Sequence, residues 1–182
     1  MTYPTLNLTE SQALTALRAF LLSILPAGTE VVKGQDNRVA QPTGPDFVVL
    51  TPILRERMAV NVVTFTDGYP SNPQTRSDLQ SVRMTVQADI HGPAGADSAQ
   101  IITTLFRSEV ATSAFAASVF DVMPIFNSEP RQAPFLNEAQ QIETRWSVDL
   151  VLQCNPVVTT AQEFASALSV GVVSVDAAYP PN

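Results

Sequence analysis

Alternation of apolar and polar residues over most of the segment 142–154 constrains the fold more than any other feature of the chain. The apolar positions are Ile142, Trp146, Val148, Leu150, Leu152 and Cys154. A period of two residues is typical of a strand that is buried on one side, because successive side chains of a strand point to opposite faces of the sheet. The segment 82–90 alternates in the same way. We therefore predict that both segments form half-buried strands of a largely antiparallel sheet.

Two helical segments accompany these strands. Thr9 and Gln12 have the spacing of a capping box, and leucine and isoleucine residues then recur every three or four positions until Pro26. After the strand at 82–90, Asp97 is the expected N-cap of a second helix, whose apolar positions extend to Val110. A third, short helix is predicted within 158–168.

The remaining segments are predicted to be strands and loops. Residues 30–33, 47–54, 58–65 and 119–126 are rich in β-branched and aromatic residues. The segments 47–54 and 58–65 are expected to form a hairpin or one long bent pair. Pro124 indicates that its strand lies at a sheet edge or at a bulge. The segments 67–78 and 127–140, which are polar and contain prolines, are expected to be loops.

This order of elements predicts an α+β domain, in which a single mostly antiparallel sheet is flanked by two main helices. Parallel strands need connections of about a dozen residues, whereas the middle of this chain places strands directly after one another. With 182 residues, 45% of them hydrophobic, the chain is expected to form one domain over 1–168. Residues 169–182 form a C-terminal arm, which either contacts a neighbouring subunit or is frayed or packed locally.

The sequence contains no recognisable catalytic motif. His91 is the only histidine, and the spacings typical of a nucleophile elbow, a phosphate-binding loop or a zinc site do not occur. The single cysteine, Cys154, excludes an internal disulfide and is expected to be buried. Asp36 and Asp46 leave a glycosidase-like carboxylate pair open, although no acid-tuning environment is visible around them. We therefore expect a protein that is not an enzyme, without catalytic, metal-binding or cofactor-binding residues.

The net charge of −7, from 10 basic and 17 acidic residues, disfavours a protein that binds DNA by neutralising phosphates. This acidity either aids solubility or, in a ring around DNA, prevents the DNA from sticking. The N-terminal residues lack the basic region and cleavage site of a signal peptide, and the apolar run 19–25 is too short to span a bilayer. Neither export nor membrane attachment is expected.

A constrained polar loop leads directly into an apolar strand over the segment 34–53, GQDNRVAQPTGPDFVVLTPI. Pro42, Pro45 and Pro52 each restrict φ and lack an amide hydrogen. Because these prolines already limit the unfolded chain, the loop is expected to keep one conformation and to suit a fixed contact.

This segment resembles the tail terminator, or neck, proteins of long-tailed bacteriophages, in which a short N-terminal helix precedes a GQ-N-R-…-P-…-GPDFVV-TP segment. The matching residues are Gly34, Gln35, Asn37, Arg38, Pro42, Gly44, Pro45, Asp46, Phe47, Val48, Val49, Thr51 and Pro52. The strand at 82–91 and the helix that follows it look similar too, so the resemblance extends over about residues 6–167. It implies a twisted sheet flanked by helices, in subunits that assemble as six-membered rings.

The resemblance also implies a structural virion protein of the tail or neck, assembled in the host cytoplasm. The expected ring caps the tail tube, stops its growth and joins the tail to a head-proximal connector or stopper protein, while DNA passes through the lumen without specific binding. A sheath protein is a further partner that the sequence leaves open. Two alternatives also remain open: a head-closure or tail-completion protein of the same neck, and a monomeric or dimeric binding module that uses the 34–53 loop.

For the terminator interpretation, five loop residues are predicted to contact another subunit or a partner: Gln35, Asn37, Arg38, Pro42 and Asp46. The polar ones are expected to form hydrogen bonds or ion pairs, within the subunit or across its boundary. For two of them, Asn37 and Asp46, the alternative is a side chain that only caps a turn, and for Arg38 it is a solvated side chain.

Overall fold

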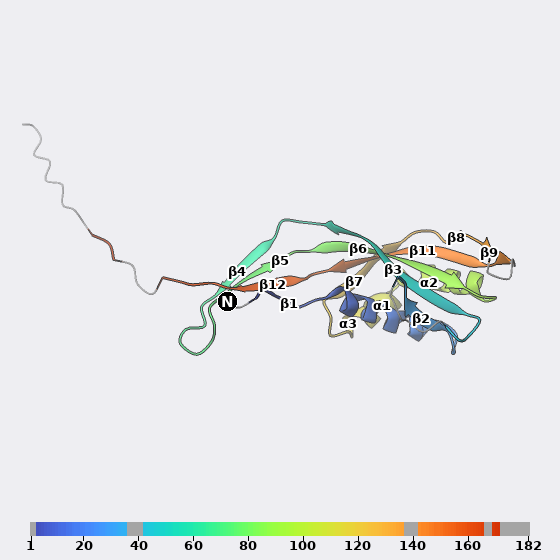
Figure 1. Cartoon of the computed structure of the whole chain (residues 1–182), viewed down its shortest axis with the longest axis horizontal. Coiled ribbons are helices and arrows are strands. Elements are labelled where there is room, and N and C mark those ends of the chain that lie inside the picture. Colours follow the sequence, from blue (N-terminus) through green and yellow to red (C-terminus); the bar gives the residue numbers. More distant parts are fainter. Residues whose placement is uncertain (1–2, 36–41, 137–141, 166–168, 172–182) are drawn as a thin grey trace, which may run out of the picture.

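The computed structural model of the chain describes residues 3–35, 42–136, 142–165 and 169–171. The helices in these ranges are α1 (Glu10–Ile24), α2 (Gly95–Phe106) and α3 (Glu109–Ala116). The strands are β1 (Thr5–Leu6), β2 (Glu30–Lys33), β3 (Phe47–Arg57), β4 (Val62–Thr66), β5 (Thr75–Leu79), β6 (Val82–His91), β7 (Val122–Asn127), β8 (Arg131–Gln132), β9 (Phe135–Leu136), β10 (Ile142–Glu143), β11 (Arg145–Cys154) and β12 (Val157–Ala161). Figure 1 shows an elongated molecule with the helices toward one end.

Most of the strands belong to two sheets. The main sheet has the order β2-β3-β6-β11-β7, with β8 also beside β11, and the distal sheet has the order β1-β12-β5-β4. All pairs in the two sheets are antiparallel except β2 with β3. The predicted α+β class with mostly antiparallel strands is therefore confirmed. The strands divide between two sheets instead of forming one, and the described residues contain three helices instead of two main ones.

The distal sheet continues the three middle strands of the main sheet. Strand β3 leads through residues 58–61 into β4, β5 leads through 80–81 into β6, and β11 leads through 155–156 into β12. Neighbours in the main sheet, β3-β6-β11, thus become neighbours in the distal sheet, β4-β5-β12. As a result the distal sheet projects past the helices, at the left of Figure 1.

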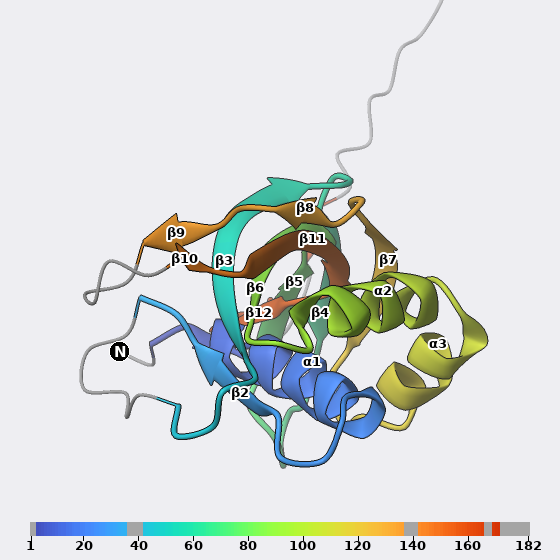
Figure 2. The same cartoon turned by 90° about the vertical axis from the view of Figure 1, so that its right-hand side faces the viewer.

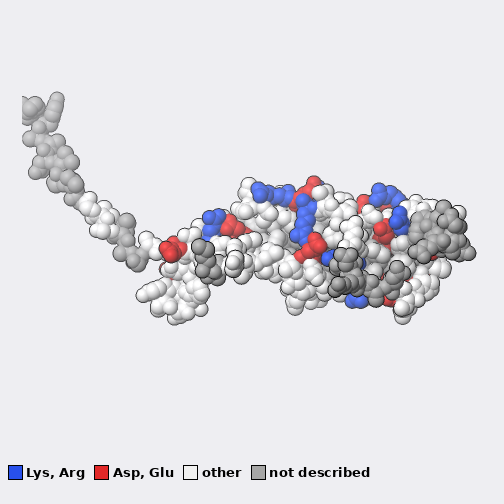
Figure 3. Space-filling view, viewed as in Figure 1, with Lys and Arg blue, Asp and Glu red and all other residues white. Residues whose placement is uncertain are grey.

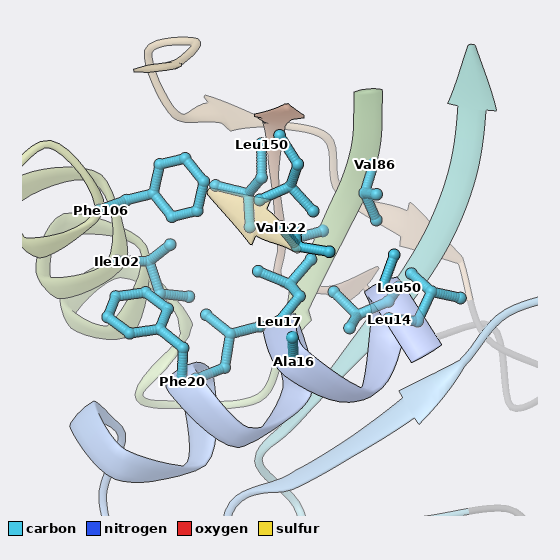
Figure 4. Close-up of a cluster of buried hydrophobic side chains, with 14 of the residues drawn as sticks. Leu14, Ala16, Leu17, Phe20, Leu50, Val86, Ile102, Phe106, Val122 and Leu150 are labelled. Atoms are coloured by element: carbon cyan, nitrogen blue, oxygen red, sulfur yellow. The ribbon is translucent and has the colours of Figure 1, made fainter. Parts of the chain in front are cut away.

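The three helices pack on one face of the main sheet, as Figure 2 shows. Their apolar side chains meet the inward-facing positions of β3, β6 and β11 in one core cluster. Figure 4 shows this cluster, in which Leu17, Ile102 and Leu150 are fully buried. Phe106 lies where the helices meet, with its ring centroid 6.0 Å from that of Phe20 and 6.4 Å from that of Phe115. The core therefore lies entirely beneath the main sheet.

The first helix begins as the sequence predicts. Thr9 Oγ1 accepts a hydrogen bond from Gln12 N (3.3 Å), and Gln12 Oε1 accepts one from Thr9 N (2.7 Å), which completes the capping box. The second helix differs, because α2 begins at Gly95 and Asp97 lies in its first turn instead of at the N-cap. Its predicted extension to Val110 is also wrong, since Ser108 caps the separate helix α3 through a hydrogen bond from Val110 N (3.2 Å).

Strands β6 and β11 are the half-buried strands that the sequence predicts, but the segment 142–154 is divided: Ile142 and Glu143 form the separate strand β10, which pairs with β9, and the Ile142 side chain is 77% exposed instead of buried. Strands β6 and β11 pair over ten residues, from Arg145 opposite His91 to Cys154 opposite Val82. Strand β7 lies at the edge of the main sheet, and its register against β11 shifts next to Pro124. Both the edge position and the irregularity expected for this proline are confirmed.

Three other predictions from the sequence are wrong. The segments 47–54 and 58–65 are not paired with each other, because β3 pairs with β2 and β6 while β4 pairs with β5. The expected loops at 67–78 and 127–140 contain β5, β8 and β9. The helix expected within 158–168 is replaced over 157–161 by β12, whose β-branched residues pair with β5 and β1; residues 166–168 lie outside the described ranges. Pairing with distant strands decides the structure in each case.

Candidate functional site: the distal sheet and the 34–46 loop

No described helix or strand packs as a layer over the distal sheet. No residue of its strands β1, β4, β5 and β12 is buried, and every residue of β4 is exposed. In the main sheet, by contrast, every residue of β6 and β11 is buried or half-buried. Antiparallel sheets commonly pack one face against a core. Both faces of the distal sheet are therefore accessible to another protein chain.

One face of the distal sheet carries no charge. Residues directly opposite each other in an antiparallel pair lie on the same face, as do alternate residues of a strand. The register places ten residues on this uncharged face: Thr5, Val62, Thr64, Thr66, Thr75, Ser77, Leu79, Val157, Thr159 and Ala161. Ser77 and Thr159 share a hydrogen bond across it (3.2 Å). Short hydroxyl and aliphatic side chains make this face suitable for close packing.

The opposite face carries an ion pair. Arg76 donates two hydrogen bonds, each of 2.9 Å, to the carboxylate of Asp78 on the same strand. The guanidinium lies 6.0 Å from the ring centroid of Phe65, and Phe164 packs edge-on against Phe65 at 6.1 Å between centroids. Leu6, Val63, Val158 and Thr160 complete this charged face. The two faces of the distal sheet therefore differ in chemistry.

Strand β4 forms one edge of the distal sheet and lacks the usual protection of an edge. Its sequence VVTFT contains no charge, proline or glycine. The exposed fraction is 59% for Val62 and 56% for Phe65, and Val60 just before the strand is 82% exposed. Exposed edges usually carry charges, prolines or bulges that prevent pairing with another chain. Figure 3 shows charged side chains over this end of the molecule as well as over the body.

The second candidate surface, the 34–46 loop, lies at the opposite end of the long strands. Glu30 Oε1 accepts hydrogen bonds from Thr43 N (2.7 Å), Thr43 Oγ1 (2.8 Å) and Gly44 N (3.1 Å). The hydrogen bond from the Gly44 backbone, followed by those from Thr43, lowers the pKa of the Glu30 carboxyl. Sequence reasoning missed Glu30, because its partners lie 13 and 14 residues away.

Asp46 joins this loop to the start of α2. Its Oδ1 accepts a hydrogen bond from Ala94 N (2.9 Å), next to the first turn of the helix. Gly92 has a φ of +102°, and a Cβ at this position would overlap the carbonyl oxygen of Pro45. Only glycine allows the two backbone segments to approach so closely. A carboxylate from a different element thus accepts the hydrogen bond of the N-cap backbone amide of α2, whereas no side chain caps the helix from the N-cap position where Asp97 was expected.

The structure places the five predicted contact residues as follows. Gln35 has a positive φ of 56°, which is uncommon for a residue other than glycine, and Pro42 is half-buried. The hydrogen bond of Asp46 is made within the subunit. Asn37 and Arg38, like Asp36 of the possible carboxylate pair, lie outside the described residues. The contact role of all five remains a prediction.

We expect the replacement of Asp46 by alanine to lower the free energy of unfolding by about 1 kcal/mol, the typical cost of a lost N-terminal helix cap. The reason is that Ala94 N loses its acceptor and the positive end of the α2 dipole loses a nearby carboxylate. Urea unfolding followed by circular dichroism measures the change. Asp46→Asn is the matched control, because it keeps an oxygen acceptor and is expected to cost less than Asp46→Ala. Equal losses for both variants would contradict the capping role.

A pocket of about 470 Å³ opens beside the loop, between Pro45, Phe47 and the segment 142–144. The rings of His91 and Phe47 stack inside it with 4.5 Å between centroids. Burial is the main influence on His91 and lowers its pKa, and the carboxylate of Asp89 partly offsets this effect.

Within the described ranges, no three His, Cys, Asp or Glu side chains gather as a metal site. None of the described helices is long and apolar enough to cross a membrane.

Cys154 is buried, as predicted, and burial raises the pKa of its thiol to about 11. Because the thiolate is the reactive form, we expect a thiol reagent to label the native protein slowly at pH 8 and rapidly in urea. The thiol form favours the folded state below its ordinary pKa, and this contribution is lost as the pH rises through about 11. Labelling at pH 8 followed by mass spectrometry checks the expected difference in rate between native and unfolded protein, with Cys154→Ser as the blank. Equally fast labelling of native and unfolded protein would contradict burial.

The uncovered distal sheet and the anchored loop define an α+β protein whose candidate surfaces suit assembly with other protein chains. A family model described as phage neck terminator protein matches residues 11–176. The chain therefore belongs to the phage neck terminator protein family, a structural and non-enzymatic component of the neck and tail of the virion. No curated protein matches the chain.

Proposed function

We propose that the subunits form a closed ring, in which the uncharged face of the distal sheet packs against a neighbouring copy. The observation that carries this proposal is that the sheet has an uncharged face and no buried residue. Association removes apolar area from water and stabilises the complex by about 25 cal/mol per Å² before the costs of association are subtracted. A face without charges adds no penalty for desolvating them.

Ring closure requires two different contact surfaces on each subunit, because a heterologous contact joins one surface of a copy to another surface of the next. The elongated subunit offers surfaces at both ends: the distal sheet at one end and the body with its loop at the other. A heterologous contact with the right rotation closes into a ring instead of an open filament. We take six as the number of subunits, because the family resemblance implies it.

The ring caps the tail tube, stops its growth and joins the tail to the head-proximal connector. One side of the ring matches the last ring of tube subunits, and the other side offers no surface for a further tube ring. The 34–46 loop suits a fixed contact with the tube or the connector, since hydrogen bonds to Glu30 and from Ala94 hold its end in place. Gln35, Asn37, Arg38, Pro42 and Asp46 are the proposed contact residues.

Light scattering of the purified protein over a range of concentrations, followed by negative-stain imaging, tests this proposal. We expect a ring with a central hole, either from the protein alone or after mixing with tail tubes. Rings that bind tube ends would support the terminator function. A monomer or dimer that neither forms rings nor binds tail tubes would overturn it and would favour a binding module.

A further inference from the structure

We propose that the C-terminal arm of one copy adds as a fifth strand to the free edge of β4 in the neighbouring copy. The inference rests on the proposed ring and names the segment that joins its subunits. The donor is the valine-rich segment 169–175 of the arm, and the acceptor is Val62–Thr66. The contact would be made by backbone hydrogen bonds, with side chains alternating between the two faces of the sheet.

The acceptor edge has no partner among the described strands of its own subunit. Strand β4 is the last strand of the distal sheet, and among the described residues it pairs only with β5. An outer strand edge presents a row of backbone N–H and C=O groups that can pair with another chain. At about 3.4 Å per residue, the five residues of β4 offer an edge of about 17 Å. A partner strand of similar length matches this edge.

The donor has the composition of such a strand. Residues 169–175 read SVGVVSV, with four valines and no charge, and the first charged residue after them is Asp176. Valine favours the extended conformation, and an uncharged strand can lie beside β4 without burying a charge. The segment is long enough to cover the five residues of β4.

Among the described residues of one copy, the outer edge of β4 and residues 169–171 have no strand partner. Beyond β12 the chain is held at the tip of the sheet, where Gln162 N donates to Gln74 O (3.1 Å) and the Phe164 ring packs on Phe65. Residues 169–171 then form no strand pairing with the described chain, and the Val170 side chain is 71% exposed. The described part of the subunit therefore presents a β4 edge without a partner strand and the start of the valine-rich segment without one, so that copies can exchange strands around a ring.

Cysteine cross-linking between differently labelled copies tests the exchange. One protein carries Thr64→Cys on β4, and a second carries a cysteine at one of the four arm valines. These positions are Val170, Val172, Val173 and Val175. The native Cys154 is buried and does not compete. After mixing and mild oxidation, we expect covalent dimers of the two proteins on a non-reducing gel. Each protein oxidised alone is the control.

The pattern of cross-linking distinguishes a strand from a flexible tail. Successive side chains of a strand point to opposite faces, so we expect one pair of positions, 170 with 172 or 173 with 175, to cross-link several-fold better than the other. Equal yields at all four positions, or no dimer, would overturn the proposal. In a protein that carries both cysteines, a link that forms only within one chain would show that the arm pairs with β4 of its own copy. This result would also overturn the proposal.

Removal of residues 169–182 separates this inference from the proposed function. We expect the truncated protein to need at least tenfold higher concentration than the full chain to form the same assembly, as measured by light scattering. Truncated rings as stable as those of the full chain would overturn the arm exchange and leave the ring itself supported. If neither protein forms rings or binds tail tubes, the proposed function fails and the arm exchange with it.

Discussion

Replacement of Thr64 by lysine is expected to convert the assembled protein into monomers. Thr64 lies in the middle row of the uncharged face, opposite Ser77, which in turn lies opposite Thr159. A lysine here would have to lose its hydration when a neighbouring copy packs on the face, and no carboxylate on this face could pair with it. A buried and unpaired charge costs several kcal/mol, so we expect the affinity between subunits to fall by more than tenfold.

The matched control is Val63→Lys, which introduces the same charge one residue away on the opposite face. Val63 lies directly opposite Asp78, so the new ammonium group has a carboxylate nearby. We expect this variant to assemble like the unmodified protein. Light scattering measures the mass of both variants, and circular dichroism checks that both are folded. Disassembly by Val63→Lys but not by Thr64→Lys would show that subunits contact the charged face instead.

The parts of the fold that the sequence predicts are those set by local patterns. The alternation in 82–90 and 142–154 yields β6 and β11, and the Thr9–Gln12 capping box marks the start of α1. These signals depend on side-chain periodicity and on backbone groups within four residues, so one sequence is sufficient to find them.

The parts that the sequence does not predict depend on residues far apart in the chain. The carboxylate that accepts the hydrogen bond from Ala94 N before α2 belongs to Asp46, 48 residues away in the sequence. A local pattern cannot indicate this contact, so the sequence pointed to the nearby Asp97 as the N-cap. Strand β12 lies between β5 and β1, which are distant in the sequence, so the local pattern that predicted a helix within 158–168 did not indicate it. A local pattern cannot indicate these pairings.

Exposure of the distal sheet is the feature of the candidate site that sequence reasoning missed. The run VVTFT of β4 has the composition of a strand in a sheet that is covered on at least one side, so it suggests contact with the core. Only the topology shows that β4, β5 and β12 extend beyond the helices that bury the other ends of the same long strands. The run without charges between Arg57 and Asp67 is the signal that could have indicated an assembly surface.

This separation of a covered body from an uncovered sheet allows stability and assembly to be changed independently. The core cluster lies under the main sheet, whereas the residues of the distal sheet make no contribution to the buried core. Substitutions on the uncharged face are therefore expected to alter association with little effect on folding, and substitutions among the helices to do the reverse. Surface changes away from buried groups usually alter stability by less than about 0.5 kcal/mol.

Replacement of Phe106 by alanine is expected to cause the largest loss of stability, about 3–5 kcal/mol. The side chain is 1% exposed, and its ring packs edge-on against both Phe20 and Phe115, so alanine would leave a cavity where the three helices meet. This is a large fraction of the roughly 5–15 kcal/mol that stabilises a typical domain. Urea unfolding followed by circular dichroism measures the loss.

The measurement requires a background that does not assemble, because association with other copies stabilises the folded subunit by mass action and would mask part of the loss. Thr64→Lys provides this background, since it changes the distal sheet and leaves the core cluster intact. Val110→Ala is the matched control, because Val110 lies on α3 and is 48% exposed, and we expect it to cost less than about 0.5 kcal/mol. A loss below about 1 kcal/mol for Phe106→Ala would mean that the phenylalanine cluster does not hold the helices on the sheet.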